Sequence, residues 1–175
     1  MKSFKEVWGT LPSGWLREVE AELLYQTAQQ TTGDILEVGC YFGRSSVLLA
    51  SLGRTVHCVD PFDGFTDDLT GDEIEARWKE SIQSRGITNA IQYRQRIENW
   101  VPRPCGFAYL DGNHTEKGTM DQLSAAFMCG VNLMCVHDVA DSGGGLEVKK
   151  AILNFYCAEL VEIVDTMAVV KRKGF

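Results

Sequence analysis

The sequence predicts an α/β protein built on a mainly parallel β-sheet flanked by helices, and three observations support this prediction. Short apolar segments alternate with longer segments of helical periodicity along most of the 175 residues. A glycine turn joins the first of these apolar segments to a helix. The last two apolar segments are separated only by Asp165 and Thr166, too few residues for a parallel crossover, so we expect a C-terminal antiparallel hairpin.

The individual elements follow from this alternation. Residues 1–14 contain two glycines and a proline, which predicts an irregular N-terminal arm that Trp8 pins to a single domain of residues 15–175. Helical spacing of apolar side chains predicts helices at residues 15–29, 47–52, 72–85, 116–129 and 148–156. Apolar runs predict strands at residues 35–38, 55–59, 91–94, 106–110, 133–136, 160–164 and 167–170. We expect Asp72 to cap its helix, and the glycines at 143–145 to form a loop or hinge.

The composition excludes several classes of partner. The net charge of −7 disfavours a nucleic acid, because a phosphate backbone is bound by a basic surface. No long apolar segment follows the first residues, so we expect no secretory signal. No run approaches the roughly 20 apolar residues that cross a bilayer, so we expect no membrane partner.

The six cysteines indicate a reducing compartment. None of them forms a Cys-x-x-Cys pair, which argues against a zinc knuckle. Most stand in apolar surroundings, where a free thiol behaves as a small hydrophobic group. We therefore expect reduced thiols and a cytoplasmic location.

The glycine turn after residues 35–38 is the first candidate binding element. Gly39 and Gly43 allow positive φ and close approach of a ligand, and Ser45 can cap the helix that follows. The turn does not match the G-x-G-x-x-G fingerprint of dinucleotide-binding proteins, and two glycines alone can be only a turn. Glu37, at the end of the strand, is unusual because a buried carboxylate needs a partner.

The residues Glu37-Val38-Gly39-x-x-x-Gly43-x-Ser45 resemble the first motif of class I S-adenosylmethionine-dependent methyltransferases. The segment 110–114, Leu-Asp-Gly-Asn-His, resembles a subfamily with an Asp-Gly-x-His turn after the fourth strand. The resemblance covers roughly residues 15–172. It implies a Rossmann-like sheet closed by the antiparallel hairpin. It also implies S-adenosylmethionine as cofactor, with the turn residues Glu37, Gly39, Cys40, Gly43 and Ser45 beside it.

Polar residues follow the predicted strands at their carboxyl ends, where open parallel sheets bind ligands. Asp60 lies about 20 residues after Gly39, the spacing of a ribose-binding acid, and the matching glycine turn favours this role over a cap for the turn before Pro61. Phe62 and Phe65 stand in the long loop 62–71, which we expect to be mobile without cofactor and to cover a ligand. The resemblance places residues 94–97 along the adenine. The cofactor-binding residues expected beyond the turn are Asp60, Pro61, Phe62, Arg96 and Asp111.

Asp111 and Asp138 end neighbouring strands and should converge, and two close carboxylates raise each other's pKa unless a cation or a histidine lies between them. A divalent metal with oxygen ligands is the first hypothesis. The catechol O-methyltransferase type, which this arrangement resembles, holds magnesium with acids at these positions. That type has a further amide or acid beside the second acid, whereas here the neighbours are His137 and Val139. A second hypothesis makes His114 or His137 the general base, with Asp138 beside it. A third is that residues 111–114 form only a turn.

The function that these patterns favour is O-methylation of a small-molecule hydroxyl, on a sugar or a phenol. With no large inserted cap, the acceptor pocket would be shallow, or a second subunit would complete it in a homodimer. Two rival hypotheses are a nicotinamide-dependent oxidoreductase and a non-catalytic nucleotide-binding module. The first lacks its G-x-G-x-x-G fingerprint, and the second has no need of the group formed by Asp111, His114 and Asp138.

Overall fold

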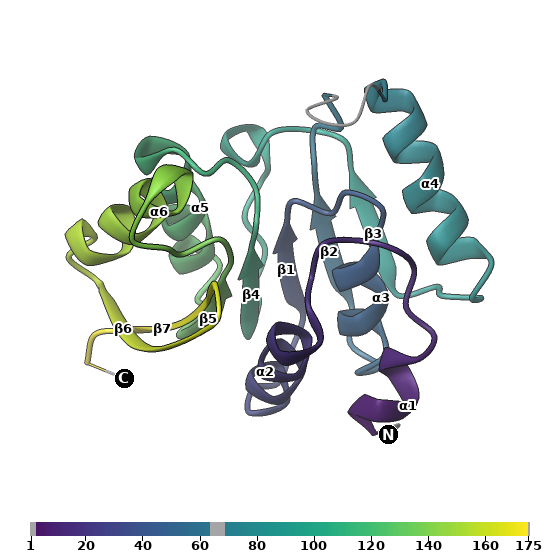
Figure 1. The fold of residues 1–175 in the computed structure, drawn as a ribbon, viewed down its shortest axis with the longest axis horizontal. Helices are drawn as coiled ribbons and strands as arrows, with labels where there is room; N and C mark the ends of the chain where they lie inside the picture. Colours follow the sequence, from purple (N-terminus) through teal and green to yellow (C-terminus); the bar gives the residue numbers. More distant parts are fainter. Residues whose placement is uncertain (1–2, 64–68, 175) are drawn as a thin grey trace.

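A seven-stranded sheet forms the centre of the computed structural model, which describes residues 3–63 and 69–174 (Figure 1). The strands lie in the order β3-β2-β1-β4-β5-β7-β6. Their bounds are β1 Ile35–Val38, β2 Val56–Val59, β3 Ala90–Tyr93, β4 Phe107–Leu110, β5 Leu133–Val136, β6 Ala158–Val164 and β7 Met167–Arg172. Strands β1 to β5 pair in parallel, and β7 pairs antiparallel with both β5 and β6. The predicted Rossmann-like fold with a C-terminal antiparallel hairpin is therefore confirmed.

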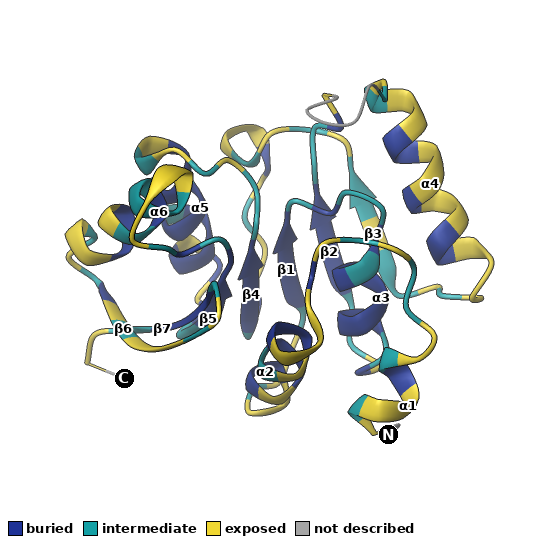
Figure 2. Cartoon of the chain, viewed as in Figure 1, coloured by how far each residue is buried: buried dark blue, intermediate teal, exposed yellow. Residues whose placement is uncertain are grey.

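Helices cover both faces of this sheet. Their bounds are α1 Phe4–Trp8, α2 Glu18–Gln29, α3 Arg44–Ala50, α4 Gly71–Gln83, the short 3₁₀ helix η1 Ile97–Asn99, α5 Glu116–Met128 and α6 Gly143–Asn154. Successive strand residues point to opposite faces, so alternate side chains enter two separate cores. Phe107 and Tyr109 pack with α1 to α4, whereas Ala108 and Leu110 pack with α5 and α6. Figure 2 shows the central strands as the most buried part of the chain.

Two local predictions, the irregular N-terminal arm and the cap of the helix at 72–85, were wrong because other residues cap these helices. The arm expected to be irregular contains α1, whose start is fixed by a capping box between Ser3 and Glu6. Trp8 does hold this arm, since its ring lies under the Arg44 guanidinium at 4.4 Å. Helix α4 is capped by Thr70 and not by Asp72.

The glycines at 143–145 form the first turn of α6 instead of a loop. A Cβ on Gly145 would lie 2.7 Å from the carbonyl oxygen of Asp138, so this turn requires glycine for close packing. The turn therefore brings the start of α6 against the end of β5, which places Gly144 and Glu147 at the cavity described below.

The loop after β2 also differs from expectation. Phe62 is buried, with 2% of its surface exposed, and its ring meets Trp78 edge-on at 6.5 Å. It is thus a core residue and not an exposed aromatic. Phe65 and half of the loop predicted to be mobile, residues 64–68 of 62–71, lie outside the described residues. Among the helices that are described, none has the length and apolar character needed to span a membrane.

Candidate active site

A cavity of about 980 Å³ opens at the carboxyl ends of β1, β2, β4 and β5. This position is where an open parallel sheet binds its ligand. The predicted site residues that line it are Gly39, Asp60, Pro61, Phe62, Arg96, Asp111, His114, His137 and Asp138. Four other predicted residues, Glu37, Cys40, Gly43 and Ser45, are not among its lining residues. Cys40 and Ser45 line a small adjoining hollow of about 50 Å³.

The turn after β1 is fixed by one glycine and one carboxylate. Gly39 has φ 84°, and a Cβ there would lie 2.0 Å from the carbonyl oxygen of Asp111, so no other residue fits. Asp60 accepts N–H bonds from Cys40 at 2.7 Å, Tyr41 at 3.1 Å and Phe62 at 2.7 Å. Burial raises the pKa of Asp60, and these three bonds oppose that rise. Asp60 therefore organises the turn while it also faces the cavity.

Glu37 has a structural position behind the turn. It is fully buried and accepts hydrogen bonds from Ser46 Oγ at 2.6 Å and from the Cys58 thiol at 3.2 Å. Trp78 in turn donates its Nε1–H to Ser46 Oγ at 3.0 Å. Burial raises the pKa of Glu37 to about 7. In this structure Glu37 links β1 to α3 and is not among the residues that line the cavity, and its cofactor contact stays a prediction.

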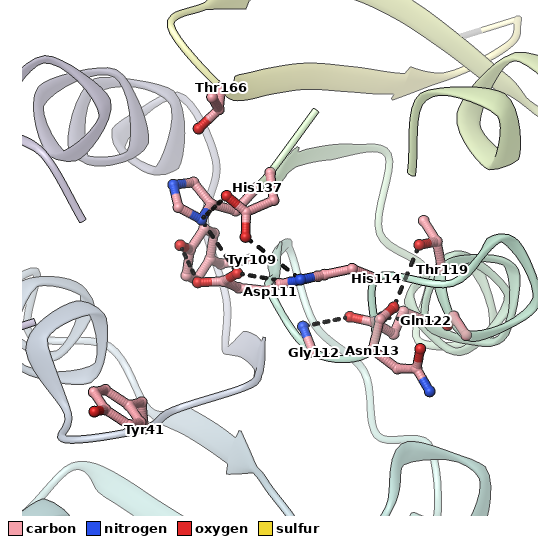
Figure 3. Close-up of polar contacts among 12 residues, drawn as sticks. Tyr41, Tyr109, Asp111, Gly112, Asn113, His114, Thr119, Gln122, His137 and Thr166 are labelled. Carbon is pink, nitrogen blue, oxygen red and sulfur yellow. Dashed lines mark hydrogen bonds and ion pairs between the residues drawn. The ribbon is translucent and has the colours of Figure 1, made fainter. Parts of the chain in front are cut away.

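Five ionisable side chains form a continuous series from Glu20, in the first turn of α2, to the cavity. Figure 3 shows the part of this series around His137, Asp111 and His114. His137 lies between Glu20 and Asp111, with its ring nitrogens 3.2 Å from each carboxylate. His114 Nε2 lies 3.4 Å from the same Asp111 oxygen, and its Nδ1 lies 3.4 Å from Asp138. Tyr109 donates its hydroxyl to the other Asp111 oxygen at 2.8 Å. Acids and imidazoles thus alternate in the order Glu20, His137, Asp111, His114, Asp138.

Glu20, at the buried end of this series of ionisable side chains, was not predicted as a site residue. Glu20 lies in the first turn of α2 and has no exposed surface. Besides His137, its carboxylate contacts the Arg17 guanidinium at 3.0 Å and the Thr166 hydroxyl at 2.6 Å. The one sequence signal was the Arg17-x-x-Glu20 spacing, in which the acid reaches back to the N-cap N–H. Tyr109 was likewise missed, because it appeared only as a member of an apolar strand.

Contacts among these ionisable side chains shift their pKa values and so decide which of them are charged. Burial by itself would lower the pKa of His137, but the contacts with Asp111 and Glu20 outweigh it and raise that pKa to about 11. Burial would likewise raise the pKa values of Glu20 and Asp111, but their bonds to His137 and other donors lower both. His137 is therefore an imidazolium near neutral pH. Its side chain is only 7% exposed, against 39% for His114, so it is less accessible to an acceptor, and its role as general base stays a prediction.

Comparison with known proteins places this arrangement in a family. The profile of a family described as "Methyltransferase domain" matches residues 36–129. That match covers more than half of the chain. The chain belongs to this methyltransferase-domain family. A search of curated protein sequences returned no match.

Solved structures share the fold of this methyltransferase domain. A candidate O-methyltransferase from Klebsiella pneumoniae is 13% identical with a TM-score of 0.65, covering 97% of this chain and 89% of its own. A TDP-rhamnose 3′-O-methyltransferase of calicheamicin biosynthesis is 17% identical with a TM-score of 0.66, covering 98% and 92%. A Podospora anserina methyltransferase bound to SAH is 14% identical with a TM-score of 0.67, covering 97% and 87%.

The methyltransferase domain does not offer a ready magnesium site in this arrangement. One ligand atom each from Asp111, His114 and Asp138 lies within 4.8 Å of the others, a spacing that one ion could share. However, the Asp111 oxygen nearest to His114 also faces the protonated ring of His137, and the His114 ring stands between the two carboxylates. Magnesium prefers oxygen ligands in octahedral geometry, which these contacts do not provide. The two imidazoles lie between the acids, as in the metal-free hypothesis.

The His137 and Glu20 pair should stabilise the methyltransferase domain in a pH-dependent manner. We predict that Glu20→Gln lowers the free energy of unfolding by about 3–5 kcal/mol at pH 6, because it leaves a buried imidazolium without this counter-ion. The contribution of His137 is complete below 6.5, its ordinary pKa, and is lost as pH rises towards about 11. That of Glu20 is complete above its ordinary value of 4.5 and is lost as pH falls further.

Urea unfolding of the parent and of Glu20→Gln from pH 5 to pH 10 measures this loss of unfolding free energy. The difference between parent and Glu20→Gln should be largest at pH 5–6.5 and shrink at higher pH. Glu18→Gln, in the same helical turn but exposed, is the matched control and should change stability by less than about 0.5 kcal/mol. Equal effects of the two substitutions, or a difference independent of pH, would contradict the assignment.

Proposed function

We propose that this chain is an S-adenosylmethionine-dependent O-methyltransferase that acts on a hydroxyl of a small molecule. The observation that carries the proposal is that His114, flanked by Asp111 and Asp138, faces the same cavity as the Gly39 turn. A nucleotide-binding module would need the turn but not a histidine between two acids. Membership of the methyltransferase-domain family and the fold shared with an SAH-bound methyltransferase support the choice of cofactor.

The cofactor would lie along the ends of β1, β2 and β3. Each carboxylate oxygen can accept two hydrogen bonds, and among the described residues the Asp60 oxygen that accepts from Phe62 takes one, which leaves a position for a ribose hydroxyl. Arg96 and Ile97, which line the cavity after β3, would flank the adenine. When bound, this cofactor supplies an electrophilic methyl group on a positively charged sulfur. The carboxylates that line the cavity suit a positively charged ligand.

His114 is the residue placed to take the proton of the acceptor. It is partly exposed to the cavity, unlike His137, and its contact with Asp111 raises its pKa in spite of partial burial. For the hydroxyl proton to pass to His114 during methyl transfer, the acceptor hydroxyl would replace one of the two 3.4 Å contacts that the ring nitrogens make with Asp111 and Asp138. Asp111 and Asp138 then stabilise the imidazolium that forms. His137 holds Asp111 in place and takes no proton itself.

Cofactor binding tests the first half of this proposal. We predict that S-adenosylmethionine binds the parent protein and that Asp60→Ala weakens binding by roughly 1.5–3 kcal/mol for each lost ribose hydrogen bond, because the acceptor is charged. Calorimetry measures the affinity, and thermal unfolding of the same sample shows whether the turn survives. Asp72→Ala, a highly exposed acid on α4, is the control and should bind as the parent does. Equal affinity in Asp60→Ala and parent would refute the ribose contact.

The pH dependence of transfer tests the second half. We predict that kcat rises with pH through the raised pKa of His114 and that His114→Ala lowers kcat by about 10²–10⁴-fold. Asp138→Asn removes one flanking charge, so the same rise should occur at lower pH. A chelator should leave the rate unchanged. Loss of activity in chelator that magnesium restores, or full activity in His114→Ala, would instead mean that the base is not His114.

A further inference from the structure

Trp15 lies at the cavity with most of its side chain in solvent. It lines the cavity, yet 63% of its surface is exposed. Other strongly exposed large apolar residues, such as Met128 and Tyr156, are not among the cavity's lining residues. A large exposed aromatic beside a cavity is the kind of surface that a ligand covers.

The exposure of Trp15 is imposed by firmly held neighbours on both sides. Before it, Gly14 packs so tightly that a Cβ would lie 3.0 Å from the Arg44 Cβ. After it, Leu16 is buried, and Arg17 is fixed by its contacts with Glu20 at 3.0 Å and Asp165 at 2.7 Å. The segment between α1 and α2 therefore holds the indole ring at a defined, exposed position.

Tyr41 extends this aromatic surface into the turn after β1. Its ring stacks on Trp15, with centroids 4.9 Å apart and planes 21° apart, and on Phe42 at 3.7 Å. Tyr41 has φ 45°, an unfavourable conformation for a residue with a side chain, and the Asp60 carboxylate accepts its N–H at 3.1 Å. Both rings line the cavity. We call Trp15 and Tyr41 the aromatic platform.

Part of the remaining cavity lining is polar and rich in carboxylates. It includes His114, Asp138 and Glu147. Among the described lining residues, both arginines already have acid partners: Arg17 pairs with Glu20 and Asp165, and Arg96 pairs with Asp63. No lysine is present among them. A phosphate or carboxylate on the acceptor would therefore meet several carboxylates, while the two arginines and the His137 imidazolium are already paired with acids.

We propose that the aromatic platform binds the ring of a neutral sugar that serves as methyl acceptor, an inference that rests on the proposed function. A sugar ring has an apolar face of C–H groups, which packs on an aromatic ring, and hydroxyls around its rim, which suit a polar lining. A phenol ring has two apolar faces. One would stack on the platform, but the other would contact the polar lining of the cavity. The hydroxyl that reaches His114 is the one methylated, with its proton passing to His114 as the methyl group transfers.

The test uses methyl α-glucopyranoside and methyl α-rhamnopyranoside as neutral probes, with glucose 1-phosphate and catechol as competing classes. Release of S-adenosylhomocysteine measures transfer. We expect transfer to a neutral glycoside and at least about tenfold lower kcat/KM for the other two classes. Trp15→Ala should raise KM for the glycoside at least about tenfold without changing the affinity for S-adenosylmethionine, and Trp15→Phe should retain most of the parent's KM. Tyr156→Ala, an exposed aromatic away from the cavity, is the matched control and should behave as the parent.

A second measurement does not depend on turnover. Trp78 and Trp100 are buried and Trp8 is partly buried, so Trp15 is the most accessible of the four tryptophans to acrylamide, and the difference between parent and Trp15→Phe isolates its contribution. Methyl glycoside together with S-adenosylhomocysteine should protect the parent's fluorescence, and Trp15→Phe should lose this protection.

Each other outcome is decisive. An unchanged KM in Trp15→Ala, or weaker S-adenosylmethionine binding in that variant, would overturn the role of the platform. Transfer only to catechol or to the phosphate, or to none of the probes by protein that binds S-adenosylmethionine, would overturn the sugar assignment. A parent protein that does not bind S-adenosylmethionine would overturn the proposed function first, and this inference with it.

Discussion

The contact of His137 with Glu20 and Asp111 is the interaction on which the candidate site depends. It joins the start of α2 to the ends of β4 and β5, three parts of the chain that are distant in sequence. Two carboxylates in a buried region would repel each other and favour protonation, unless a cation lies between them. The imidazolium of His137 is that cation. Because of it, Asp111 stays ionised where β4 ends, and a second acid, Asp138, can lie close by.

Two histidines in one network thereby acquire different chemical roles. His137 is almost fully buried between two acids, and its pKa of about 11 keeps it charged. His114 faces the cavity, and its proton can exchange with a ligand there. Environment and not residue type separates the fixed charge from the candidate base. The same principle accounts for Asp60, whose carboxylate both shapes the glycine turn and faces the cavity, so one side chain serves fold and site together.

The sheet could be predicted because its signals are local. Apolar periodicity marked the strands, and the two residues between β6 and β7 allowed only a hairpin. Glu20 could not be predicted, since periodicity marks it as a polar helix position and only the tertiary fold shows that α2 buries it against β5. Phe62 was misplaced for the converse reason: an aromatic in a polar loop gives no local sign that Trp78 covers it. The sequence could predict that Asp111, His114 and Asp138 lie close together, because the strands that precede them, β4 and β5, are neighbours in the sheet.

The protonation state of His137 is the central claim, and NMR titration of the imidazole groups measures it directly. The chain has only three histidines, so each can be assigned by single substitution. The account predicts that the ring signals of His137 remain those of an imidazolium through pH 9, whereas His114 titrates at a pKa above its ordinary value. Titration of His137 near 6.5, as for an unperturbed histidine, would contradict the account, because Asp111 would then lack its cation at neutral pH.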